Sequence, residues 1–195
     1  HFNEINELPQ GARVGSCSLR RIVQLKAIRP DLEILDLRGN VNTRLMKLDK
    51  GEYDAIILAC AGLIRLGFED RIRQPLDAET SLPAVGQGAL GIENRRGDDA
   101  VSELIKPLID TKTMTEVLAE RAMNATLEGD CSVAIAGYAK TMGEELLLKG
   151  LVGNVESGSI LRAESTGSTS QPKALGELVA NQLLEIGAGK LLEGG

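Results

Sequence analysis

Aromatic residues are scarce in this sequence, which has no tryptophan and only two residues each of tyrosine and phenylalanine. With a sequence pI near 5.0 as well, we expect no nucleic-acid partner, because such partners favour basic surfaces and aromatic stacking. Histidine occurs once, at His1, which excludes Ser/His/Asp and Cys/His catalysis and the usual histidine metal sites. The three cysteines, Cys17, Cys60 and Cys131, are odd in number and widely spaced, which predicts reduced thiols and no metal site.

Long apolar runs are also missing, since none approaches the roughly 20 residues that a membrane-spanning helix requires. The first ten residues, HFNEINELPQ, lack the basic and apolar regions of a secretory signal. We therefore expect a cytoplasmic protein without a membrane partner.

Charge is unevenly distributed along the chain, although the net value is −6. Residues 1–73 carry 12 basic against 10 acidic side chains, and nine of the basic ones are arginine. Arginine is suited to forked recognition of carboxylate or phosphate. This composition favours a small anionic ligand.

Short apolar runs alternate with helical stretches from residue 12 to residue 72. This alternation predicts a parallel sheet, and we assign residues 1–82 to an α/β domain. The expected strands cover 12–18, 32–39 and 54–62, and the expected helices cover 19–30, 42–51 and 63–72.

The segment SLPAVGQGALGIENR, residues 81–95, interrupts this pattern with Pro83 and three glycines. GQGALG matches GxGxxG, but a dinucleotide site requires a preceding strand and a following helix, so we interpret these as hinge glycines. We predict a strand at residues 91–93 that leaves the first domain.

The remaining sequence predicts a small α+β domain. We expect helices at 98–110 and 113–129, three strands of an antiparallel sheet at 132–141, 145–154 and 159–166, and a final amphipathic helix at 172–192.

Three strand-to-helix turns combine small residues with arginine: GSCSLRR (15–21), LRGNVNTR (37–44) and ACAGLIR (59–65). Free N–H groups at a helix N-terminus favour anions, and such turns lie together at the carboxyl ends of parallel strands. We expect one crevice lined by Arg20, Arg21, Arg38, Arg44 and Arg65. The alternative is that Ser18 and Asn42 only cap helices, and we expect Arg29, Arg71 and Arg73 to be surface charges.

Cys131 lies in the glycine-bearing loop of TLEGDCSVAIAGYA (126–139). One interpretation is an inert, half-buried thiol. The other is an accessible thiol that carries a covalent attachment, and a permanent thioether is as plausible as a turnover nucleophile.

Five motifs in order, VGSCSLRR, LRGNVNTRL, LDKGEYDAIILACAGLIRLG, SLPAVGQGALGIE and AERAMNATLEGDCSVAIAGYA, resemble the porphobilinogen deaminase (hydroxymethylbilane synthase) family. The resemblance implies a cytoplasmic transferase of tetrapyrrole and haem biosynthesis. It condenses four porphobilinogen units into hydroxymethylbilane, releasing ammonia at each step, on a covalent dipyrromethane cofactor.

The resemblance also implies site residues and a domain plan. It places the cofactor thioether on Cys131, catalytic arginines at Arg38 and Arg65, and cofactor-binding residues at Ser18, Arg20, Arg21, Asn40 and Arg44. It makes residues 1–82 a substrate- and cofactor-binding domain of periplasmic-binding-protein type, 83–106 a return segment of another domain, and 107–195 the cofactor-attachment domain. The full-length protein is expected to be a monomer.

Two features depart from the family pattern. The family's acid is an aspartate in an SxKDxP motif that this sequence lacks, so we expect an incomplete and inactive chain without the catalytic aspartate. The family's EGGCxxP loop reads EGDCSVA at residues 128–134. The alternatives are a non-catalytic module of periplasmic-binding-protein type that binds a small dicarboxylate, and a non-functional partial protein.

Overall fold

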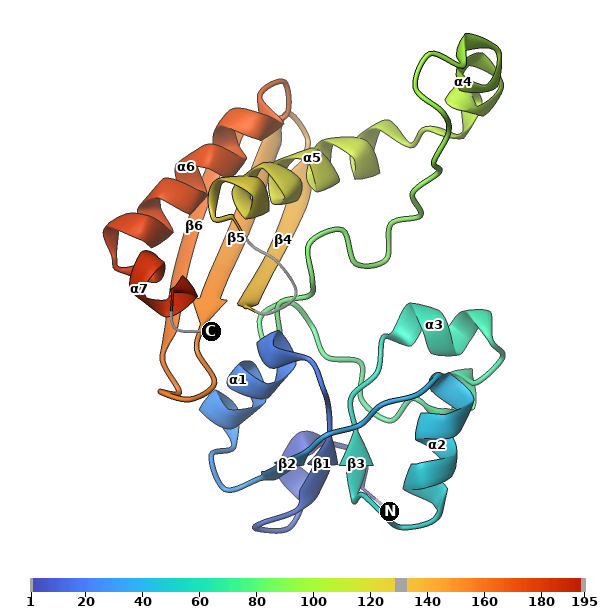
Figure 1. Cartoon of the computed structure of the whole chain (residues 1–195), viewed down its shortest axis with the longest axis vertical. Coiled ribbons are helices and arrows are strands. Elements are labelled where there is room, and N and C mark those ends of the chain that lie inside the picture. The colour runs from blue at the N-terminus through green and yellow to red at the C-terminus, as the bar shows by residue number, and fades with distance from the viewer. Residues whose placement is uncertain (1, 129–132, 194–195) are drawn as a thin grey trace.

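The structure of the protein, a computed structural model, describes residues 2–128 and 133–193. Figure 1 shows an N-terminal module (residues 2–82) and a C-terminal module (residues 111–193), joined by a segment that runs through a small outlying helix. No helix within the described ranges is both long and apolar enough to span a membrane.

The N-terminal module is built around a parallel three-stranded sheet with the order β2-β1-β3. Val14 of β1 is in register with Ile34 of β2 on one side and Ala55 of β3 on the other. The parallel sheet predicted from the alternating pattern is therefore confirmed, with shorter strands. The elements in order are η1 (Ile5–Glu7), β1 (Arg13–Gly15), α1 (Leu19–Ile28), β2 (Glu33–Leu35), α2 (Val41–Asp49), β3 (Ala55–Ile56), α3 (Cys60–Arg65) and η2 (Glu69–Arg71).

Glycine is required at the end of β1 because neighbouring side chains crowd the backbone there. A Cβ atom on Gly15 would lie 3.0 Å from side-chain atoms of Leu37, Tyr53 and Ile56. The absence of a side chain at Gly15 therefore allows these three side chains to pack against the end of β1.

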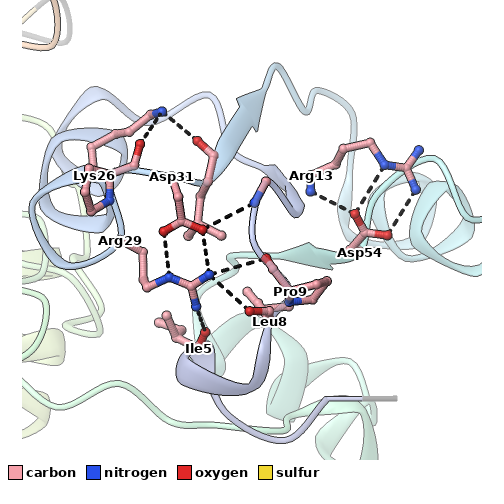
Figure 2. A network of polar contacts seen from close by, with 11 residues as sticks. Ile5, Leu8, Pro9, Arg13, Lys26, Arg29, Asp31 and Asp54 are labelled. Carbon is pink, nitrogen blue, oxygen red and sulfur yellow. Dashed lines mark hydrogen bonds and ion pairs between the residues drawn. The ribbon is translucent and has the colours of Figure 1, made fainter.

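Arg29 is a structural residue, which corrects the expectation that it is a surface charge. Its side chain is only 17% exposed and pairs with Asp31, with an Nη2 to Oδ2 distance of 2.7 Å. It also donates to the carbonyls of Ile5 at 2.9 Å and Leu8 at 3.0 Å, as Figure 2 shows. The sequence does not reveal this role because the two carbonyl acceptors lie 24 and 21 residues before Arg29.

The segment that follows Leu82 contains no strand, so the strand predicted at 91–93 is wrong. No neighbouring strand pairs with it, and its apolar side chains are exposed, with Leu90 83% and Ile92 54% exposed. Gly86 and Gly88 adopt φ values of 69° and 94°, which favour glycine. GQGALG therefore lies in an irregular segment, as expected, without the strand-to-helix context of a dinucleotide site.

An antiparallel three-stranded sheet with the order β4-β5-β6 forms the C-terminal module, as predicted. The predicted final helix is divided in two because Gly187 adopts a φ of 105° between α6 and α7. The outlying elements are α4 (Asp99–Ile105) and η3 (Lys106–Leu108). The module itself consists of α5 (Thr111–Thr126), β4 (Ala134–Met142), β5 (Glu145–Gly153), β6 (Ile160–Ser168), α6 (Pro172–Glu185) and α7 (Ala188–Leu192).

Both faces of the antiparallel sheet are covered. Helices α5 and α6 lie side by side on one face (Figure 1), where Met123 and Leu183 are fully buried with Leu148 of β5. A Cβ atom on Gly176 would collide with the Ala119 carbonyl, so glycine allows these helices to approach closely.

The other face of the sheet meets the N-terminal module through α1. Val23 of α1 packs there in a cluster with Ala136 of β4 and Leu151 of β5. Apolar contacts therefore hold the arginine-bearing helix α1 against the C-terminal module.

Candidate functional site

Arg21 lies in the first turn of α1 and reaches the end of β3. Its Nη1 donates to the carbonyl of Ile57 at 3.1 Å. Burial is the largest influence on this side chain and lowers its pKa, and the positive charges of Arg20 and Arg44 lower the pKa further. The guanidinium groups of Arg20 and Arg44 therefore both act on Arg21, which favours an anion beside Arg21.

The environment of Arg21 contains thiols rather than carboxylates. Cys17 and Cys60 act in the opposite direction and raise its pKa. Within residues 2–128 and 133–193, no carboxylate lies within ion-pair distance of Arg21. The positive charge of Arg21 is thus not neutralised by the described side chains, which suits an acidic ligand.

Backbone and side-chain contacts hold the other two arginines. Arg20 Nη2 donates to Gln87 Oε1 at 2.9 Å, and Arg44 Nε donates to the Gly39 carbonyl at 2.7 Å. Fixed side chains lose less conformational entropy when a ligand binds.

Ser18 stands at the N-cap position of α1, but its hydroxyl makes no capping bond. The Ser18 Oγ is buried and has no hydrogen-bond partner among the described residues. A buried hydroxyl without a partner is costly, so it is a candidate ligand donor beside Arg21. Ser18 was expected either to bind a ligand or to cap α1, and its geometry does not support capping.

Asn40, rather than the expected Asn42, caps α2. Its Oδ1 accepts the Thr43 N–H at 2.9 Å and the Thr43 hydroxyl at 3.0 Å. The capping alternative therefore applies to Asn40, whose predicted contact with a ligand stays a prediction.

Arg38 and Arg65 are not joined to the Arg21 group by the contacts of the described residues. Arg38 is 82% exposed and pairs with Asp36 at 2.9 Å. Arg65 is exposed and lies in the last turn of α3, away from the start of that helix. Their assignment to catalysis stays a prediction, and so does a single crevice containing all five arginines.

A cleft of about 830 Å³ reaches Arg20 and Arg21, whereas Arg44 and Ser18 are not among its lining residues. It is lined by Arg20, Arg21 and Gln87 together with Ile57, Cys60 and Leu82. This volume is typical of small-molecule sites, which combine apolar walls with a few polar groups.

Two of the three cysteines lie in the part of the chain that the structure describes. Cys17 is exposed and Cys60 is half-buried, and both are free thiols. Cys131, the predicted attachment site, lies outside the described residues, so its role stays a prediction. No group of three or more His, Cys, Asp or Glu side chains in residues 2–128 and 133–193 is arranged to hold a metal ion.

Sequence reasoning missed Gln24, Gln87 and Glu120 as residues near the site. Gln24 and Glu120 are buried polar residues with 1% and 6% exposure. Glu120 lies one residue after Ala119 and three before Met123, which are both core residues. This position could have indicated that the carboxylate is buried.

These features define a mixed α/β protein with one parallel sheet, one antiparallel sheet and an arginine-lined cleft at the parallel sheet. A family model described as "Porphobilinogen deaminase, dipyromethane cofactor binding domain" matches residues 1–103. A second, described as "Porphobilinogen deaminase, C-terminal domain", matches residues 114–185. The chain therefore belongs to the porphobilinogen deaminase family, as the sequence motifs predicted.

Two curated relatives carry the same family name. The porphobilinogen deaminase of Ruthia magnifica subsp. Calyptogena magnifica is 62% identical over 192 residues, covering 98% of this chain and 63% of the relative. That of Vesicomyosocius okutanii subsp. Calyptogena okutanii (strain HA) is 58% identical over 193 residues, covering 99% of this chain and 64% of the relative. The chain thus spans less than two thirds of the length of these relatives.

Proposed function

We propose that this protein is a transferase that condenses four porphobilinogen units into hydroxymethylbilane on a dipyrromethane cofactor. The observation that carries the proposal is the half-buried Arg21, which lies near the positive charges of Arg20 and Arg44 and has no described carboxylate within ion-pair distance. An acidic side group of a pyrrole would neutralise the charge of Arg21.

The residues present fit the cofactor for which the matching domain is named. Arg20, Arg21 and Arg44 would bind its acidic side chains, and the unpaired Ser18 hydroxyl would donate a further hydrogen bond. When bound, the cofactor supplies the pyrrole ring from which the new chain is extended. Cys131 is proposed to hold it through a thioether.

The described residues supply binding and orientation. Arg21 stays protonated despite its lowered pKa, because an arginine is not deprotonated under physiological conditions. Its bond to the Ile57 carbonyl fixes the guanidinium at the end of β3. Partial burial strengthens its attraction to a carboxylate relative to the same pair in water.

We also propose that the N-terminal module is of periplasmic-binding-protein type. Support comes from the parallel order β2-β1-β3 and from the bond between Arg21, after β1, and the Ile57 carbonyl, after β3. In open parallel sheets, ligands bind outside the carboxyl ends of the strands, and Ile57 directly follows β3.

Residues 83–106 are proposed to be the return segment of another domain. This proposal is supported by exposed apolar side chains in the segment, including Leu90 at 83% and Leu104 at 77%, which another domain would cover. Assignment of 107–195 to cofactor attachment and a monomeric full-length state stay predictions. The inactivity expected from the missing SxKDxP motif is the competing prediction, and assembly of a two-pyrrole adduct on Cys131 would contradict it.

Binding to porphobilinogen tests the proposed function. Isothermal titration of the 195-residue chain with porphobilinogen should give saturable binding that weakens with added salt, because the recognised groups are charged. Succinate and a pyrrole without acidic side chains are the matched ligands, and both should bind more weakly.

Two outcomes would contradict the proposal. Absence of porphobilinogen binding by a folded chain would remove its basis. Succinate binding as tight as porphobilinogen binding would instead favour the alternative, a small-dicarboxylate module without catalysis.

A further inference from the structure

The residues that join the two modules also hold one of the arginines of the site. We propose that Glu120 of α5 is a positioning residue for Arg20, acting through residues 82–87, here named the strap. The inference deepens the proposed function, because it treats Arg20 as a ligand-binding group.

The first end of the strap is attached to α1 by Gln24. Its Nε2 donates to the Leu82 carbonyl at 3.1 Å and to the Arg20 carbonyl at 2.9 Å. Its Oε1 accepts the Leu82 N–H at 2.8 Å. One buried side chain thus ties the start of the strap to the backbone of the residue whose side chain is to be positioned.

The middle of the strap is attached to the C-terminal module. The Gly137 N–H of β4 donates to the Pro83 carbonyl at 3.1 Å. Val85 packs against the core between the antiparallel sheet and its helices. The strap therefore follows the position of the C-terminal module rather than that of α1 alone.

Glu120 makes the last attachment before Gln87. Its Oε2 accepts the Gly86 N–H at 2.6 Å, and its Oε1 accepts the Ala139 N–H of β4 at 2.8 Å. One carboxylate thus joins α5, β4 and the strap, and it is buried to 6% exposure. Burial raises its pKa, the two N–H donors lower it, and the charge of Glu116 on the same helix raises it.

The strap ends in the contact with the arginine. Gln87 directly follows Gly86, and its Oε1 accepts from Arg20 Nη2 at 2.9 Å. Gln87 is exposed, so its side chain depends on its backbone for placement. Fixing the Gly86 N–H on Glu120 therefore fixes where the Gln87 amide meets Arg20.

This arrangement gives the C-terminal module a role in the N-terminal binding site. Moving Glu120 would displace Gly86, and the Arg20 side chain would lose its hydrogen bond to Gln87 and shift from its present position. Glu116 provides a matched control, because its Oε1 accepts the Thr141 N–H of β4 at 2.8 Å in the same way. No described hydrogen bond joins Glu116 to the strap.

The first test measures the environment of the Arg20 side chain by NMR in the absence of ligand. In the 195-residue chain, the Arg20 Nε–H signal is assigned by ¹⁵N NMR through its loss in Arg20→Lys. Glu120→Gln should shift this signal, because the amide nitrogen of glutamine cannot accept a hydrogen bond and only one of the Gly86 and Ala139 N–H groups would keep an acceptor. Glu116→Gln should leave the Arg20 signal unchanged. Gln87→Ala should shift the Arg20 signal as well. If Glu120→Gln does not fold, Glu120→Asp, whose carboxylate is withdrawn by one methylene, replaces it.

The second test is a double-mutant cycle on porphobilinogen binding. Glu120→Gln should weaken binding about tenfold, the size expected when one charged hydrogen bond is lost, and Glu116→Gln should not. In the Arg20→Lys background, Glu120→Gln should cause little further weakening.

An unchanged Arg20 signal in the folded Glu120 variant, or fully additive effects on binding, would overturn the positioning role. If the parent chain does not bind porphobilinogen, the proposed function fails by itself. The NMR comparison then still decides whether Glu120 positions Arg20.

Discussion

Arg21 donates from Nη1 to the carbonyl of Ile57 at 3.1 Å, joining the first turn of α1 to the end of β3. This bond holds a half-buried cation at the point where the parallel strands end. The positive charges of Arg20 and Arg44 lower the pKa of this guanidinium group, in addition to the larger effect of burial.

Replacement of Arg21 should weaken ligand binding more than it weakens the fold. Arg21→Lys keeps the charge but loses the forked donor geometry, so we expect about tenfold weaker porphobilinogen binding by calorimetry. Arg21→Gln should bind more weakly still. Arg95→Gln is the control, since Arg95 is 90% exposed and pairs with Asp98, the residue that caps α4; equal effects at positions 21 and 95 would refute a specific site.

Asp31 should govern part of the acid sensitivity of the N-terminal module. Its hydrogen bonds with Arg29 hold its pKa well below the usual range of an aspartate, and a lowered pKa stabilises the fold only while the group is ionised. This stability is present above about pH 4 and is lost as the pH falls through the folded-state pKa. Urea unfolding of Asp31→Asn should therefore show lower stability at pH 7 and a shallower decline between pH 5 and pH 3; parallel pH profiles would contradict this.

Glu120 should affect the pH dependence of stability in the direction opposite to that of Asp31. Because burial raises its pKa, the folded state holds the proton to higher pH than the unfolded state. The associated stability is present below about pH 4.3 and is lost as the pH rises through the folded-state pKa. The free energy of unfolding of Glu120→Gln, relative to the parent chain, should thus increase as the pH rises above 4. A constant difference would contradict the raised pKa.

Gly176 should be intolerant of a side chain. A methyl group there would collide with the Ala119 carbonyl and press on Ala122, forcing α5 and α6 apart. We expect Gly176→Ala to lower the free energy of unfolding by roughly 1–3 kcal/mol, as overpacking usually does. Gly189→Ala in α7 is the control, since a Cβ atom at that position would have no neighbour within 4 Å among the described residues. That control should be neutral or stabilising, because alanine favours helix.

Local patterns predicted the sheets and their order of elements because alternation and helix periodicity are properties of neighbouring residues. They placed the parallel strands, the antiparallel strands and α5 in the right parts of the chain. They failed where contacts between distant residues, or the backbone angle of one residue, determine the secondary structure. The predicted strand at 91–93 has no partner strand, and Gly187 divides the last helix through a backbone angle that sequence does not specify.

For the same reason, the sequence predicted that Arg20 and Arg44 lie near Arg21, since turns after parallel strands meet at one edge of a sheet. Ligand binding by these three arginines stays a prediction. Arg29 was misjudged because the carbonyls of Ile5 and Leu8 that it contacts are far away in sequence. Glu120 escaped notice because its partners Gly86 and Ala139 contribute only backbone groups.

The most direct test of the account is the covalent state of Cys131 after incubation of the reduced chain with porphobilinogen. Intact-mass spectrometry with peptide mapping should find a two-pyrrole adduct on the peptide that contains Cys131, and Cys131→Ser should remove it. A chain that binds porphobilinogen with its arginines yet keeps an unmodified Cys131, or carries the adduct on Cys17 or Cys60 instead, would contradict the account.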